Sequence, residues 1–327
     1  METNSMTVVN VGPILEDLLT TIKKEAIPEY VYLNRSAPAL HRNALGIMED
    51  TLPEILVLLG IRSLMVNSSY DYTPLNTLRI DIPEATKEEY LWPYLRKDEV
   101  IRELQSLFRN CRMVGFDNWA AMSSASSVWD GLLSDVIKPL ERNDLEFLFY
   151  LGDPVEKLSF QVGEALDIVS DFSQNGQVTF ALDEGEAINL WKMLNGVGKD
   201  VSLGEQTYVD FRRKYYSIFR TMDIARVLIY SASTAMVFTA KEQFAITRKI
   251  VDHEIEVAPD ARLNYIVGFS TGLALGLSMA HCIALGLIVF GAQGELKASP
   301  EKKDLVRYTE EWIADLQKTA TINLYGE

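Results

Sequence analysis

The sequence predicts a mainly α-helical protein of two helical lobes, with one or two short β-hairpins or edge strands. Two observations lead to this prediction: apolar residues recur at helical spacing through several long segments, and a glycine-rich stretch separates two of these segments. The predicted N-terminal lobe covers residues 1–196, and the C-terminal lobe covers residues 205–327 with a central helix of small and apolar residues. A chain of 327 residues that is 48% hydrophobic is long enough for two packed lobes.

The N-terminal lobe is interpreted as a series of helices. In residues 13–26 the apolar residues fall on one face, while Glu16 and Asp17 lie early and Lys23 and Lys24 lie late, which suits the helix macrodipole. A short edge strand is predicted at residues 78–83. Further helices are predicted over 39–59 with an interruption near Pro53, over 84–92 and 97–112, over 117–150 with a break near Pro139, and over 155–172.

The segment after residue 172 carries clear local signals. An Asn-Gly turn precedes a short strand, and Asp183 followed by Glu186 three residues later predicts a capping box at the start of a helix. That helix leads into the glycine-rich stretch LNGVGKDVSLGE, residues 194–205. The stretch is similar to a phosphate-binding loop, but Met193 and Asp200 stand where such a loop requires a glycine and a hydroxyl residue. It is therefore interpreted as a hinge between the lobes.

The pentapeptide GFSTG, residues 268–272, matches the nucleophile elbow of serine hydrolases. In that fold the serine is followed along the chain by an acid and then by a histidine. The last histidine here is His281, about three helical turns after Ser270 and out of its reach on one helix. His41 and His253 precede the serine, so the order of residues argues against a hydrolase.

Small residues recur every four positions around this motif, at Gly268, Gly272, Gly276, Ala280 and Ala284. On a helix they form one ridge that allows another backbone to approach closely. The segment 265–292 contains no Asp, Glu, Lys or Arg and exceeds the roughly 20 residues that cross a bilayer, so a membrane span is an alternative. Its polar residues and glycines favour a buried central helix, or two shorter helices broken near Gly286.

A last helix is predicted after Ser299 and Pro300, which suit its cap and first turn. Its apolar stripe needs a partner, either the core of the same chain or a neighbouring subunit. The stripe consists of Leu305, Tyr308, Trp312 and Leu316.

Basic residues are concentrated in one part of an acidic chain. The net charge is −15, yet residues 211–249 carry eight basic residues against two acidic ones. Residues 208–230 have the apolar spacing of one continuous helix, and Arg213, Tyr216 and Arg220 follow one another along one of its faces, which suits phosphate contacts and base stacking. The alternative is that these cations neutralise acidic helices of the same chain. The predicted nucleic-acid-binding residues are Arg212, Arg213, Lys214, Tyr216, Arg220, Arg226, Lys241, Arg248 and Lys249.

The sequence shows no complete catalytic set and no metal-ligand spacing, so no catalytic residue, metal or cofactor is assigned. The favoured hypothesis is a non-enzymatic, self-assembling homo-oligomer, in its sharpest version a nucleoprotein that binds single-stranded RNA or DNA. The alternatives are a helical enzyme with an unlocated carboxylate or arginine site, and a membrane-inserting protein that acts through residues 265–292. Two cysteines, Cys111 and Cys282, and a start without a basic and apolar leader predict a cytoplasmic protein.

Overall fold

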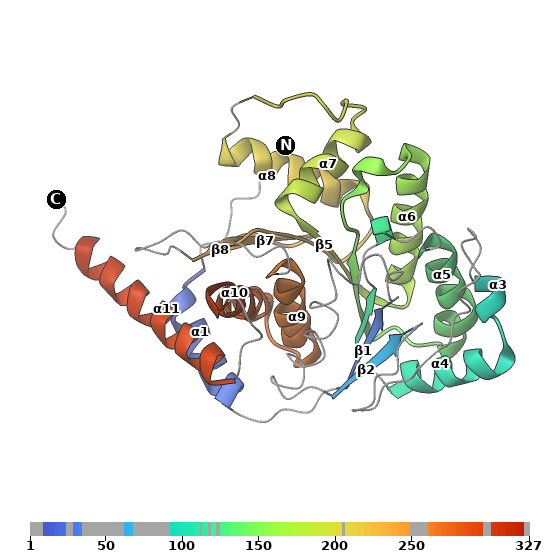
Figure 1. Cartoon of the computed structure of the whole chain (residues 1–327), viewed down its shortest axis with the longest axis horizontal. Coiled ribbons are helices and arrows are strands. Elements are labelled where there is room, and N and C mark those ends of the chain that lie inside the picture. The colour runs from blue at the N-terminus through green and yellow to red at the C-terminus, as the bar shows by residue number, and fades with distance from the viewer. Residues whose placement is uncertain are drawn as a thin grey trace.

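The chain folds around one large β-sheet with helices on both faces (Figure 1). The computed structural model describes residues 9–23, 29–34, 62–67, 92–110, 113–116, 119–121, 125–204, 207–248, 261–296 and 302–323. The prediction of a mainly α-helical protein is therefore wrong, and the fold class is α/β. The predicted elements at 39–59 and 78–83 lie outside the described residues, as do Ser299, Pro300 and Lys249.

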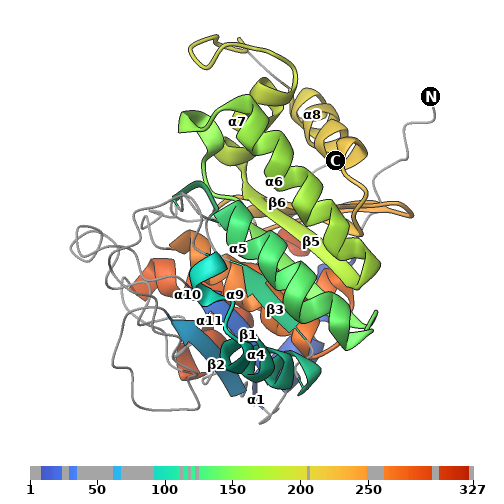
Figure 2. The ribbon, with the colours of Figure 1, turned by 90° about the vertical axis from the view of Figure 1, so that its right-hand side faces the viewer.

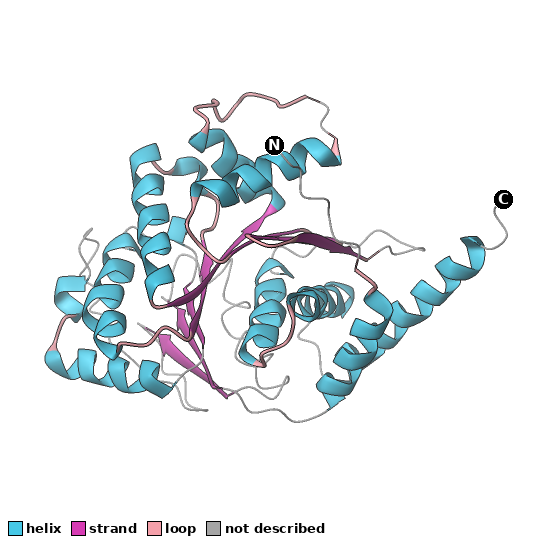
Figure 3. Ribbon diagram, turned by 180° about the vertical axis from the view of Figure 1, so that it is seen from behind, coloured by secondary structure: helices cyan, strands magenta, loops and turns pink. Residues whose placement is uncertain are grey.

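The sheet has eight strands in the order β2-β1-β3-β4-β5-β6-β7-β8. Neighbouring strands are parallel from β2 through β6, whereas β7 and β8 follow as an antiparallel meander. Figure 3 shows the strands as one continuous layer between helices. The strands are β1 (Glu29–Asn34), β2 (Arg62–Asn67), β3 (Met113–Phe116), β4 (Leu145–Tyr150), β5 (Gly176–Asp183), β6 (Arg226–Tyr230), β7 (Thr234–Thr239) and β8 (Gln243–Thr247).

The helices divide between the two faces of the sheet and bury two separate hydrophobic cores (Figures 1 and 2). One face is covered by α3 (Trp92–Leu95), α4 (Asp98–Asn110), α5 (Ala125–Gly131), α6 (Ser159–Asp171), α7 (Glu184–Leu194) and α8 (Tyr208–Thr221). A π-helical turn, Leu132–Ile137, and a 3-10 turn, Lys138–Leu140, extend α5. The other face is covered by α1 (Val11–Lys23), α9 (Ala261–Ala274), α10 (Met279–Leu296) and α11 (Lys302–Asn323).

Two strands lie where the sequence predicts helix. The predicted helix over 117–150 ends in β4, and the predicted helix over 208–230 stops at Thr221 and is followed by β6. Both strands are nearly continuous apolar runs, LEFLFY and RVLIY, because parallel strands are covered on both faces and do not alternate in polarity. Short apolar runs of this kind do not separate strand from helix by periodicity.

The predicted boundary between lobes lies in the connection between α7 and α8. Strand β5 precedes this connection and β6 follows it, and the two strands are hydrogen-bonded neighbours in the sheet. The β-sheet is thus continuous from one predicted lobe to the other.

Several predicted elements are confirmed. Helices α1, α4 and α6 lie within the predicted ranges to within a few residues, and the strand and helix around Asp183 form as expected. The capping box is complete: the Glu186 backbone N–H donates to Asp183 Oδ1 at 2.8 Å, and the Asp183 N–H donates to Glu186 Oε2 at 2.8 Å. Helix α11 buries Leu305, Tyr308 and Trp312 of its predicted stripe against the core of the same chain.

The small-residue segment forms two helices, and the break falls at residues 275–278 instead of near Gly286. Gly276 ends the first helix with a φ of 70°, a conformation that favours glycine. The predicted close approach is confirmed, since a Cβ on Gly268 would lie 2.6 Å from the Leu285 carbonyl oxygen and one on Gly272 would lie 2.8 Å from Cys282 Cα. Among the described helices, none has both the length and the apolarity that a membrane crossing requires.

Candidate active site at the carboxyl edge of the sheet

The topology indicates where a ligand would bind. In open parallel sheets, ligands bind outside the carboxyl ends of the strands, near the point where the strand order reverses. Here the order reverses between β1 and β3, because the chain moves from β1 outward to β2 and then returns to β3, β4, β5 and β6. The carboxyl ends of β3 through β6, with the residues that follow them, therefore form the candidate site.

Helix α7 begins at this edge and brings acidic side chains to it. The capping box holds Asp183 and Glu186 almost completely buried, and the Tyr150 hydroxyl at the end of β4 donates a hydrogen bond of 2.8 Å to Glu186 Oε1. Glu184, the first residue of α7, reaches solvent. Strands β4 and β5 and helix α7 thus place three carboxylates and one phenol within a short stretch of the edge.

The proton affinity of Glu184 is altered by its surroundings. The pKa of Glu184 is raised above its ordinary value of 4.5, first because the protein around the carboxyl group reduces its contact with water, and then because the charge of Asp183 repels it. Tyr215 of α8 is affected in the same direction, because burial and then the charges of Glu184 and Asp183 raise its pKa. Glu184 therefore retains its proton to higher pH than an unperturbed glutamate does, a property shared by groups that bind or transfer protons in active sites.

The second component of the site is the N-terminal end of α9. The ring of Tyr265, in the second turn of α9, stacks on that of Tyr230, the last residue of β6, with centroids 4.5 Å apart and planes at 6°. Further along α9, Gly272 lies against Cys282 of α10. The charges of Arg226 and Glu146, at the amino ends of β6 and β4, act on the pKa of the Cys282 thiol. Helix α9 therefore runs antiparallel to the strands.

This direction places the first turn of α9 beyond the carboxyl ends of the strands. A helix N-terminus offers unpaired backbone N–H groups and the positive end of a dipole. Such an end binds phosphate or carboxylate groups without any particular side chain. The edge thus combines an anion-binding helix end with the carboxylates of α7.

A third group of side chains lies over β3 and β4. After β3, the 3-10 turn Trp119–Ala121 is anchored by the Ala120 N–H, which donates to the Leu151 carbonyl at 2.8 Å. The Trp119 indole N–H donates to Ser126 Oγ at 3.0 Å, and the Lys157 ammonium lies 5.1 Å from the centroid of the Trp119 ring. Burial lowers the pKa of Lys157 below its ordinary 10.5.

The structure separates the basic residues that the sequence analysis groups into one binding face. Arg226 is buried and pairs with Glu146 at 2.7 Å, and Arg248 is buried with its guanidinium 3.5 Å from the centroid of the Tyr308 ring. Arg212 donates to Gln243 Oε1 at 2.9 Å.

The remaining residues of that set have different surroundings. Lys214 lies over Trp191 with its ammonium 5.0 Å from the ring centroid, and the half-buried Tyr216 packs beside Phe238. Arg213, Arg220 and Lys241 are exposed. For these three, anion binding stays a prediction.

Sequence reasoning missed the site itself. It recognised Asp183 and Glu186 as a helix cap but not as part of a ligand-binding edge, and it missed Tyr150, Glu184 and Lys157. The available signal was the pattern of a buried apolar run that ends in Asp-Glu-Gly-Glu and continues as a helix, which is a strand-to-helix junction of an α/β sheet. Ser270 of the GFSTG motif is buried, and its hydroxyl donates to the Val267 carbonyl at 3.0 Å.

Comparison with known proteins identifies the fold. No protein-family model matches the chain, and no curated protein sequence matches it. Among solved structures, the chain is similar to adenosine kinase from Sinorhizobium meliloti, with a TM-score of 0.53, 13% identity, and coverage of 87% of this chain and 98% of that one. It is similar to a probable sugar kinase from Rhizobium etli CFN 42, with a TM-score of 0.53, 12% identity and the same coverage. The ADP complex of Bacillus subtilis pyridoxal kinase matches with a TM-score of 0.50 and 9% identity over 80% of this chain and 89% of that one.

These similarities define a carbohydrate-kinase-like α/β fold. They contradict the hypothesis of a non-enzymatic, self-assembling, all-α structural protein, and they give no support to an RNA-binding nucleoprotein. Of the functions considered from the sequence, the alternative of an enzyme with an unlocated carboxylate or arginine site is better supported than the main hypothesis, although on an α/β fold instead of a helical one.

Proposed function

We propose that the protein is a small-molecule kinase, which binds a nucleotide at the carboxyl edge of the sheet and transfers a phosphoryl group to a small polar acceptor. The observation that carries this proposal is the position of α9, whose first turn projects past the ends of the strands because Tyr265 stacks on Tyr230. The fold neighbours support it by name, since they are an adenosine kinase, a sugar kinase and a pyridoxal kinase that holds ADP.

Each part of the edge has a role in this proposal. The backbone N–H groups of the first turn of α9 would bind the phosphates, because they carry partial positive charge and need no side chain. Phosphoryl transfer depends mainly on positioning and on stabilisation of phosphate charge, so a helix end aimed at the reacting group is well suited to it.

A nucleotide polyphosphate usually arrives with Mg²⁺, which prefers carboxylate and water oxygens and neutralises phosphate charge. Glu184 is the carboxylate of the α7 start that reaches solvent, whereas Asp183 and Glu186 are buried in their capping box. Within the described residues, no group of three or more potential ligands forms a metal site by itself. If a hydrated Mg²⁺ ion arrived with the nucleotide, Glu184 would be the residue available to hold it, and the ion would neutralise phosphate charge.

The test is direct nucleotide binding followed by an activity screen. Isothermal titration with Mg-ADP and Mg-ATP should give one site per chain, and the protein should release ADP from ATP in the presence of a sugar or nucleoside acceptor. Glu184→Gln should lower turnover by at least about tenfold, which corresponds to about 1.4 kcal/mol of transition-state stabilisation. Glu164→Gln, on an exposed position of α6, is the matched control. Absence of binding at millimolar nucleotide would refute the proposal.

A further inference from the structure

The side chains over β3 and β4 form a second polar group at the same edge, separate from the start of α7. Trp119 lies after β3, Ser126 belongs to the first turn of α5, and Lys157 follows β4 just before α6. Two connections and helix α5 thus meet at one indole ring, with the ammonium over its face and the hydroxyl at its nitrogen.

Among the described residues, no carboxylate neutralises the positive charge of Lys157. Its ammonium lies over the Trp119 ring, and no carboxylate of the described residues pairs with it. By contrast, the neighbouring Glu156 pairs with Lys199 at 3.5 Å, and Asp153 accepts two hydrogen bonds from Asn189 at 3.0 and 3.2 Å. The carboxylates nearest to Lys157 in sequence are therefore already engaged by other partners.

Holding a cation in this position has a cost. Lys157 is partly buried, and burial lowers the pKa of its ammonium, so the folded chain disfavours the charged form. The interaction with an indole face offsets part of this cost, but it supplies no counter-charge for the N–H donors of the ammonium. An anionic ligand would supply that counter-charge.

Ser126 adds a donor on the same ring. Its oxygen accepts the hydrogen bond of the Trp119 indole, so its own proton is available to donate. Leu158 and Phe160, which follow Lys157 in the sequence on either side of the first residue of α6, are 59% and 70% exposed. A small molecule seated here would meet a cation and a hydroxyl beside an apolar rim.

We propose that Lys157, held over the buried ring of Trp119, binds an anionic group, a phosphate or a carboxylate, on the acceptor substrate, with Ser126 as a second donor. The identification of the ligand as the acceptor substrate rests on the proposed kinase function, whereas the anion site itself does not depend on that function. The start of α9 lies past the end of β6, and the Lys157 group lies past the ends of β3 and β4, with β5 between them in the same sheet. The acceptor class is then a sugar or nucleoside derivative that already carries a negative charge.

Inorganic phosphate is the first probe, because it tests the subsite without any nucleotide. Phosphate should change the tryptophan fluorescence of the intact chain saturably at constant ionic strength. The chain has five tryptophans, so Trp119→Phe assigns the signal by removing it. Acetate in place of phosphate distinguishes the two anion chemistries.

The decisive variant is Lys157→Met, which keeps the aliphatic length and removes the charge. It should weaken phosphate binding by at least about tenfold, and Lys157→Arg should retain binding. Lys138→Met is the matched control, because Lys138 is exposed in the 3-10 turn before β4. Circular dichroism confirms folding of each variant. Equal phosphate affinity in folded Lys157→Met and in the unaltered chain would overturn the proposal.

Failure of this proposal is distinguishable from failure of the kinase proposal. If Lys157→Met loses phosphate binding while the unaltered chain binds no nucleotide, the subsite stands and the kinase function falls. If nucleotide binds but phosphate affinity does not depend on Lys157, the subsite falls and the kinase function stands. If both the kinase function and the anion subsite are correct, Lys157→Met should raise KM for phosphorylated or carboxylated acceptors and leave Kd for ADP unchanged.

Discussion

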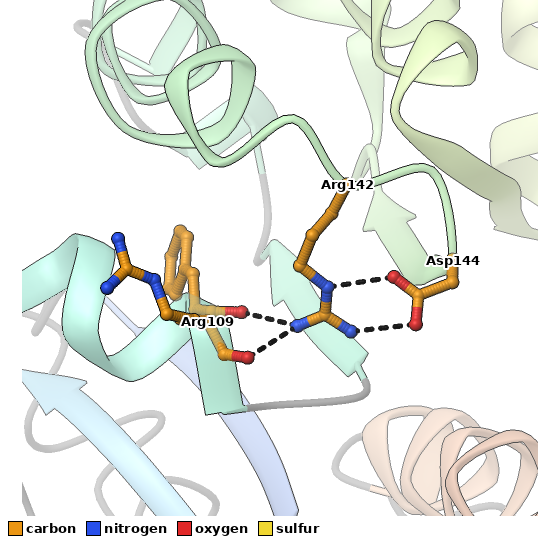
Figure 4. Close-up of polar contacts among 4 residues, drawn as sticks. Arg109, Arg142 and Asp144 are labelled. Atoms are coloured by element: carbon orange, nitrogen blue, oxygen red, sulfur yellow. Dashed lines mark hydrogen bonds and ion pairs between the residues drawn. The ribbon is translucent and has the colours of Figure 1, made fainter.

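Arg142 and Asp144 form a bidentate ion pair, with Nε 2.8 Å from Oδ1 and Nη2 3.0 Å from Oδ2 (Figure 4). The third nitrogen, Nη1, donates to the carbonyl oxygens of Phe108 and Arg109 at 2.8 and 2.9 Å. These carbonyls belong to the last turn of α4, which has no intrahelical donors for them. Arg142 therefore caps α4 and connects it to the turn that leads into β4.

Arg142→Met should lower the free energy of unfolding by about 2–3 kcal/mol, because it removes charge-assisted hydrogen bonds to a helix end. Asp144→Asn should cost less than about 1 kcal/mol, since the Asp144 side chain is 68% exposed. Urea unfolding followed by circular dichroism measures both. Arg109→Met, at an exposed side chain of the same helix end, is the control, and a loss as large as that of Arg142→Met would contradict the cap.

A partly buried ion pair joins two strands that are not neighbours in the sheet. Arg226 of β6 and Glu146 of β4 lie on either side of β5, with Nη2 2.7 Å from Oε2. Glu146→Gln should destabilise the fold by about 3–5 kcal/mol, because it leaves a guanidinium buried without its counter-charge. The double variant Glu146→Leu with Arg226→Met should recover most of this loss. Additive losses in the double variant, measured by urea unfolding, would show that the pair is not a coupled unit.

The helices were largely predictable from sequence, whereas the sheet was not. Helix α1 has an apolar face and helix α7 has a capping box, and both signals are local. Strand β4 has neither alternation nor a hairpin partner, because its pairing with β3 and β5 joins residues far apart in the chain. In the sequence, the apolar pattern of α8 runs on through β6, because RVLIY is buried on both faces of the sheet and is therefore apolar throughout.

The site could not be located without the sheet. Asp183, Tyr150 and Lys157 lie in separate segments that meet only at the carboxyl ends of neighbouring strands. Sequence spacing does not distinguish a buried cation such as Arg226 from an exposed one such as Arg213. Of the basic residues that the sequence groups together, Arg226 and Arg248 are buried, whereas Arg213, Arg220 and Lys241 are exposed.

The close contact between α9 and α10 depends on Gly268. A Cβ there would lie 2.6 Å from the Leu285 carbonyl oxygen and 2.8 Å from Gly286 Cα, so both helix backbones would have to move. Gly268→Ala should cost about 1–3 kcal/mol of unfolding free energy. Gly163→Ala on α6, where no atom lies within 4 Å of the new Cβ, should instead stabilise by about 0.4–1 kcal/mol. Equal effects at the two sites, measured by urea unfolding, would refute this account.

The raised pKa of Glu184 predicts how stability depends on pH. Its cause is burial first and then repulsion from Asp183, so the folded chain binds the Glu184 proton more tightly than the unfolded chain does. Where the folded state binds more protons, the free energy of unfolding falls as pH rises. This contribution is fully present below the ordinary value of 4.5 and is lost as pH passes through the raised pKa.

Glu184→Gln removes this titration, so its stability relative to the unaltered chain should increase as the pH is raised from about 4.5 to neutrality and then level off. Urea unfolding at several pH values measures the difference, and Glu164→Gln on α6 controls for the loss of one negative charge from an acidic chain. If the stability of Glu184→Gln relative to the unaltered chain instead decreases as the pH rises, the folded state favours ionised Glu184. That result would contradict the repulsion from Asp183. Mg-nucleotide should reduce the slope, because a cation beside Glu184 favours its ionised form.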